Sequence, residues 1–159
     1  MATMEELKRL YQAYDRKVQD VKSKTSGFAG AFNMGDDPRR HSCHEEFYEA
    51  VGAWVESFLE EDPTAQQAAE ALQWLLEAAA ENRGRDVYWY MYAAQSHGKG
   101  LIPLVSRETC ESLMQWYDRT YPALDRLPAQ QEIFKLLRKG TGREEKIFRS
   151  WKLPFGKRK

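Results

Sequence analysis

Residues 42–81 read SCHEEFYEAVGAWVESFLEEDPTAQQAAEALQWLLEAAAE, and the prediction of the fold starts from this stretch. In its first half the large apolar residues recur three or four positions apart and share one arc of a helical wheel, with the glutamates on other faces. That arc holds Cys43, Phe47, Val51, Trp54 and Phe58. After Asp62-Pro63 a second stripe follows with the same spacing: Ala68, Leu72, Leu75, Leu76 and Ala79. The stretch therefore predicts two acidic amphipathic helices, the first starting between Pro38 and Ser42, that pair as an antiparallel hairpin.

The same helical period extends outward in both directions. Thr3-x-x-Glu6 is a capping box that opens an N-terminal helix, whose apolar seam packs on this chain or on a partner helix. That seam comprises Met4, Leu7, Tyr11, Tyr14, Val18 and Val21. Ser106 and Pro128 are start signals for two further helices. The sequence as a whole predicts an all-α fold, a compact, bundle-like array of six to seven helices.

One segment leaves two alternatives open. Residues 87–92, VYWYMY, are apolar on all sides and could form a short strand by composition. The continuation through Ala93, Ala94 and Gln95 and the lack of a partner strand favour a largely buried helix.

The length of 159 residues fits one domain of ordinary size. Gly140-Thr141-Gly142 has the composition of a hinge. We therefore expect a single helical domain over residues 1–140, followed by a short helix and a basic, aromatic tail over residues 141–159.

Composition narrows the class of protein. Apolar residues make up 42% of the chain and charged residues 30%, which is enough for a core with a polar surface. No apolar run is long enough for a membrane helix, and residues 1–10 carry charges where a signal peptide would be apolar. Two cysteines cannot form a disulfide framework and fit a reducing compartment. We expect a soluble, cytoplasmic protein without a cofactor.

The formal net charge is zero, but the charges are unevenly distributed. Residues 41–82 contain ten acidic and no basic residues, whereas residues 135–159 contain ten basic and two acidic residues. Such asymmetry is typical of proteins that attract a partner electrostatically, and it also fits an acidic helix pair that complements a basic tail within the fold.

Two groups of residues are therefore candidates for partner binding. The acidic group could occupy a basic groove on another protein, and it comprises Glu45, Glu49, Glu56 and Glu60. The tail interleaves cations with aromatic rings, a pattern that suits nucleic acid, an acidic protein groove or an anionic surface. Its members are Lys146, Arg149, Trp151, Lys152, Phe155, Lys157, Arg158 and Lys159.

The cluster from Arg39 to Glu45 is the candidate for chemistry. His41, His44 and Glu45 are spaced so that a helix could turn them to one side as metal ligands. Cys43 near a helix start could be a nucleophile with a histidine as its base. In another interpretation, Arg39 neutralises the charge of a phosphate group and His44 acts as the general acid or base. The alternative is a core cysteine beside two capping or surface histidines.

We predict a non-enzymatic interaction protein, an adaptor or an inhibitor, that binds a protein or nucleoprotein partner through the acidic helix pair and the basic aromatic tail. The alternative function is a metal- or histidine-dependent hydrolase, nuclease-like, centred on residues 41–45. Monomer and dimer are equally compatible with the sequence.

Overall fold

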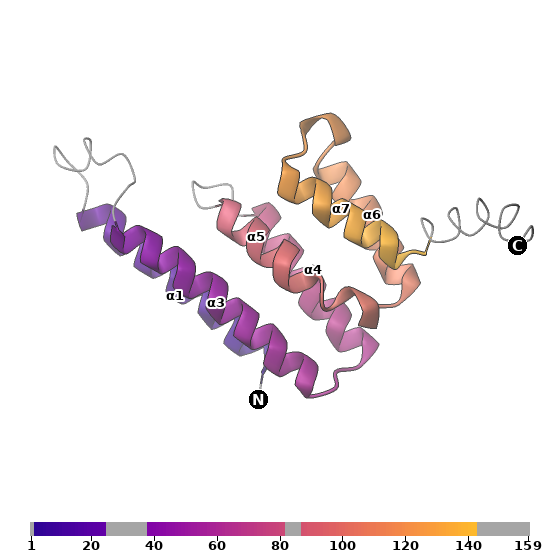
Figure 1. Ribbon diagram of the computed structural model, residues 1–159, viewed down its shortest axis with the longest axis horizontal. Helices are drawn as coiled ribbons and strands as arrows, with labels where there is room; N and C mark the ends of the chain where they lie inside the picture. The colour runs from indigo at the N-terminus through magenta and orange to yellow at the C-terminus, as the bar shows by residue number, and fades with distance from the viewer. Residues whose placement is uncertain (1, 25–37, 82–86, 143–159) are drawn as a thin grey trace, which may run out of the picture. The chain divides into compact units, whose positions relative to one another are not determined.

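The computed structural model describes residues 2–24, 38–81 and 87–142, which form helices and the turns between them (Figure 1). Within these ranges there is no strand, so the predicted all-α fold is confirmed, and residues 87–92 are helical. The elements are α1 (Met4–Lys24), α3 (Pro38–Glu60), α4 (Ala65–Glu81), α5 (Val87–Gly98), η1 (Ile102–Leu104), α6 (Arg107–Thr120), η2 (Ala123–Asp125) and α7 (Pro128–Gly140), of which η1 and η2 are short 3-10 helices.

The described helices divide into two compact units. The first unit, Met1–Asp62, contains α1 and α3, and the second, Pro63–Lys159, contains the rest. Because α3 and α4 belong to different units, the antiparallel hairpin expected of them stays a prediction, as does the single domain over residues 1–140. The tail over residues 143–159 lies outside the described residues.

In the first unit, α1 and α3 lie side by side (Figure 1). The predicted cap opens α1, because the Thr3 hydroxyl oxygen accepts a hydrogen bond from the Glu6 N–H at 3.2 Å. The predicted apolar seams of the two helices meet and are buried, with Tyr14 stacked on Phe47 at 4.2 Å between ring centroids. The buried residues of these seams are Leu7, Tyr11, Tyr14, Val18 and Val21 of α1 and Phe47, Val51, Trp54 and Phe58 of α3. The seam of α1 thus packs within its own chain.

Polar contacts fix the register of this pair. The Trp54 indole N–H donates to the Thr3 carbonyl at 2.8 Å near one end, and Lys17 pairs with Glu46 at 3.2 Å near the other. Residue numbers rise along α1 as they fall along α3, so the two helices are antiparallel.

The second unit is a set of four α-helices, in which α4 packs on α5, α5 on α7, and α6 on α7. Two of its helices begin at side-chain caps: Thr64 and Gln67 bond reciprocally at the start of α4, and the Ser106 hydroxyl accepts from the Thr109 N–H at the start of α6. The stripe predicted for α4 is buried as expected.

The end of α7 approaches α6 and η1 closely at Gly140. A Cβ added at Gly140 would lie 2.6 Å from Cys110 Sγ and 3.0 Å from Ile102 Cγ2. The Cys110 side chain is fully buried, and Ile102 is partly buried. A glycine is therefore needed here for contact between the helices.

We expect Gly140→Ala to lower the free energy of unfolding by about 1–3 kcal/mol, because the added methyl group overpacks this contact. The effect is measured by hydrogen exchange in α6 and α7 and by the midpoint temperature of thermal unfolding. Cys110→Ala in the same chain removes the closest atom, so the double variant should lose less stability than the two single variants added together. A Gly140→Ala chain as stable as the wild type would contradict the close approach.

Candidate functional site

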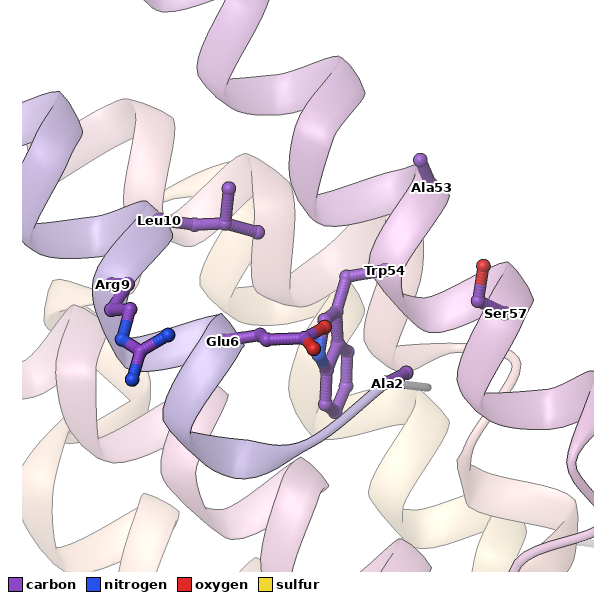
Figure 2. Close-up of a pocket in the computed structure, with 7 residues that line it drawn as sticks. All are labelled: Ala2, Glu6, Arg9, Leu10, Ala53, Trp54 and Ser57. Carbon is purple, nitrogen blue, oxygen red and sulfur yellow. The ribbon is translucent and has the colours of Figure 1, made fainter.

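Two hollows lie along one side of the α1–α3 pair. The larger has a volume of about 420 Å³ and is lined by Ala2, Glu6, Arg9, Leu10, Ala53, Trp54 and Ser57 (Figure 2). The smaller has a volume of about 160 Å³ and is lined by Leu10, Ala13, Tyr14, Lys17, Cys43, Glu46, Phe47 and Ala50. Leu10 lines both, so the hollows are consecutive parts of one furrow, which we call the α1–α3 groove.

The groove exists because small side chains border the buried seam. On α3 the positions that line it, from Cys43 through Ala50 and Ala53 to Ser57, are three, four or seven apart and form one stripe. The stripe lies next to the arc of large residues that packs on α1. Figure 2 shows Leu10 and Glu6 extending from α1 toward α3, and Trp54 reaching back from α3. The exposed lining of the groove is mainly apolar.

The groove has the dimensions of a helix. On α1 it runs from Glu6 to Lys17, which corresponds to about 17 Å, or about three helical turns, and Ala2 lines it ahead of the helix. The Lys17–Glu46 ion pair joins the two walls at one end.

A row of carboxylates borders the groove on α3. Glu49 and Glu56 lie one helical turn before and after Ala53, and Glu60 lies one turn after Ser57. These three side chains and Glu45 are exposed, as the sequence predicted. Among the α3 side chains that the structure describes, residues 42–60, there is no lysine or arginine. The groove therefore has an acidic border along its whole α3 side.

His44 lies in the core of the helix pair, where only 9% of the residue is exposed. Its Nδ1 is 2.6 Å from the Tyr14 hydroxyl oxygen, and the two groups share a buried hydrogen bond. Cys43, in contrast, is only half-buried and forms part of the groove wall. The sequence interpretation that placed the cysteine in the core and this histidine at a cap or the surface was wrong. The reason is that α3 already begins at Pro38, so position 44 is inside the helix and turns toward α1.

The remaining members of the predicted chemical cluster are not brought together in the described residues. Glu45 is exposed, and the side chains of Arg39 and His41 lie outside the described part. Across residues 2–24, 38–81 and 87–142, no three side chains from His, Cys, Asp and Glu gather as metal ligands would. In the second unit, burial raises the pKa of the Cys110 thiol and so disfavours the reactive thiolate. The metal and catalytic assignments stay predictions.

The predicted tail residues also lie outside the described part of the chain: Lys146, Arg149, Trp151, Lys152, Phe155, Lys157, Arg158 and Lys159. Their role in partner binding stays a prediction. The groove itself was not predicted from the sequence. The pattern that could have indicated it is the helical spacing of Ala50, Ala53 and Ser57 beside the arc of large apolar residues.

Comparison of the chain with protein-family models, curated proteins and solved structures finds no match. Among the helices that the structure describes, none has both the length and the apolar character needed to cross a bilayer.

We expect Tyr14→Phe to destabilise the first unit by about 1–3 kcal/mol, because it removes the hydroxyl that bonds the buried His44 ring. Hydrogen exchange followed by mass spectrometry should show faster exchange in α1 and α3. Tyr92→Phe is the matched control, since Tyr92 is 43% exposed and belongs to the second unit. Equal protection of α1 and α3 in wild type and Tyr14→Phe would contradict a stabilising role for this bond.

Proposed function

We propose that this chain is a non-enzymatic interaction protein, an adaptor or an inhibitor, that binds a protein partner by receiving a helix of that partner in the α1–α3 groove. The observation that supports the proposal is a groove of helical length, mainly apolar, with a continuous row of exposed glutamates on one side.

The shape of the groove favours a helix as its occupant. Two packed helices leave a furrow along their seam, and a third helix fills such a furrow when small side chains permit interaxial distances of about 8–10 Å. Ala13 on α1 and Ala50 and Ala53 on α3 provide that approach. An amphipathic helix lying in a groove is a common mode of protein recognition.

The glutamates beside the groove indicate which charge the partner helix carries. A helix in the groove turns one flank toward Glu49, Glu56 and Glu60, and cations on that flank would form ion pairs with them. Such pairs at an exposed border add modest affinity, but they steer association and set orientation. We therefore propose a partner helix with lysines or arginines along one flank. The basic aromatic tail, from Lys146 to Lys159, is proposed as a second contact, with protein or nucleic acid.

A direct test uses a designed amphipathic peptide with leucine and alanine on one face and lysines along one flank. Fluorescence anisotropy should show that the full-length chain binds this peptide and that binding weakens as salt rises. The triple variant Glu49→Lys, Glu56→Lys, Glu60→Lys should bind about tenfold more weakly, since three exposed pairs of about 0.5 kcal/mol each are lost.

Two controls make the test specific. The triple variant Glu70→Lys, Glu108→Lys, Glu132→Lys carries the same change in net charge on the second unit and should bind as the wild type does. Bound peptide should also slow alkylation of Cys43, which lines the groove. Equal affinities for both triple variants, or peptide binding that leaves Cys43 alkylation unchanged, would exclude the groove as the site.

A further inference from the structure

One side chain divides the α1–α3 groove into two hollows of unequal size. Leu10 lines both of them, and their volumes are about 420 Å³ and 160 Å³. Leu10 of α1 and Ala50 of α3 each lie halfway between the two polar contacts that fix the register of the helices. The long side chain of Leu10 is therefore level with the short side chain of Ala50, and it forms a ridge between the hollows.

The two hollows are separated by about two turns of a helix. From the middle of one lining to the middle of the other is about 8 Å along α1 and about 13 Å along α3, at about 1.5 Å per residue. The mean of these separations, about 10 Å, is the rise of seven residues in a helix. Residues seven positions apart return to nearly the same face of a helix. One helix lying along the groove can therefore place one side chain in each hollow.

The larger hollow combines an apolar lining with a few polar groups. Trp54 contributes an aromatic edge, and the polar groups come from Glu6 and Arg9 of α1 and Ser57 of α3 (Figure 2). A tryptophan or a tyrosine matches this combination, because its ring packs against Trp54 while its N–H or O–H donates to the Glu6 carboxylate. These two residue types are also among those that most often dominate the binding energy of an interface.

The smaller hollow matches one apolar side chain. A cavity of about 150 Å³ lined by apolar residues holds a single benzene ring, and this hollow has a similar volume of about 160 Å³. The charged residues of its lining, Lys17 and Glu46, pair with each other at 3.2 Å. The rest of the lining is mainly apolar, so a side chain of the size of leucine fits there better than a charged one.

We infer that the partner helix binds through two anchors seven positions apart, a tryptophan or tyrosine in the larger hollow and a leucine in the smaller one. An alanine or glycine lies between the anchors, over the ridge formed by Leu10. This inference rests on the proposed function, because it specifies the apolar face of the helix that the groove receives. Since the two hollows differ in size, the order of the anchors also sets the direction in which the partner helix lies.

Peptides built on the lysine-flanked helical design test the inference, with fluorescence anisotropy measuring their affinity for the full-length chain. The parent peptide carries tryptophan at position i, alanine at i+4, leucine at i+7 and alanine at i+11. Replacing the tryptophan by alanine should weaken binding about tenfold. Exchanging the residues at i+7 and i+11 keeps the composition and the apolar face but changes the spacing of the anchors, and it should weaken binding by a similar factor.

The ridge gives a second test. A leucine at position i+4 of the peptide should weaken binding to the wild type about tenfold, because it meets Leu10. The variant Leu10→Ala removes the ridge and should recover most of this loss, while it binds the parent peptide nearly as the wild type does. Leu104→Ala is the matched control, since Leu104 is 39% exposed and belongs to the second unit, and it should recover none of the loss.

Equal affinity of the wild type for the parent and exchanged peptides would overturn the inference, and this comparison does not depend on the stability of any variant. A Leu10→Ala chain that rejects leucine at i+4 as strongly as the wild type does would also overturn it. If all the peptides bind equally and still slow alkylation of Cys43, the two-anchor pattern alone is wrong and the proposed function stands. If none of them binds, both proposals are wrong.

Discussion

The burial of one aromatic-rich seam between α1 and α3 is the interaction on which the candidate site depends. Tyr11 and Tyr14 pack around Phe47, and Trp54 stacks on Phe58 at 4.9 Å between ring centroids. Apolar burial of this kind is strong but not directional, so it does not fix how far one helix slides along the other. The polar groups within and beside the seam supply that direction. The Trp54–Thr3 and Tyr14–His44 hydrogen bonds would be lost by a shift of one turn.

The groove follows from the same packing. On α3, the arc of large residues that packs on α1 lies beside a stripe of cysteine, alanine and serine that the seam leaves uncovered. Because the large residues hold the helices together, the small ones on the adjacent arc leave a furrow rather than a filled layer. The register then sets which charged residues of α1 and α3 lie at the same height along the helix pair. Because Tyr14, Phe47 and Trp54 belong both to the seam and to the lining of the groove, a change at these positions would alter both.

His44 illustrates how tertiary packing changes the meaning of a motif. In the sequence, two histidines, a cysteine and two glutamates within six residues indicate metal binding or catalysis. In the structure, the imidazole of His44 is enclosed by the helix pair and bonded to the Tyr14 hydroxyl, thirty residues away. Its neighbour Cys43 turns instead toward the groove. Adjacent residues on a helix point about 100° apart, so a dense cluster in sequence is divided between different environments.

The sequence by itself determined the helices and their buried faces. Capping residues at Thr3 and Ser106, and apolar residues three and four apart, depend on local backbone geometry, which a sequence encodes directly. The exposure of the α3 glutamates followed from the same periodicity. The tertiary structure alone decided that α1 is the partner of α3, that His44 is buried, and that alanines form a groove between charged borders. These features depend on contacts between residues 29 to 51 positions apart, which no local pattern specifies, because the same amphipathic face can pack against any helix of matching shape.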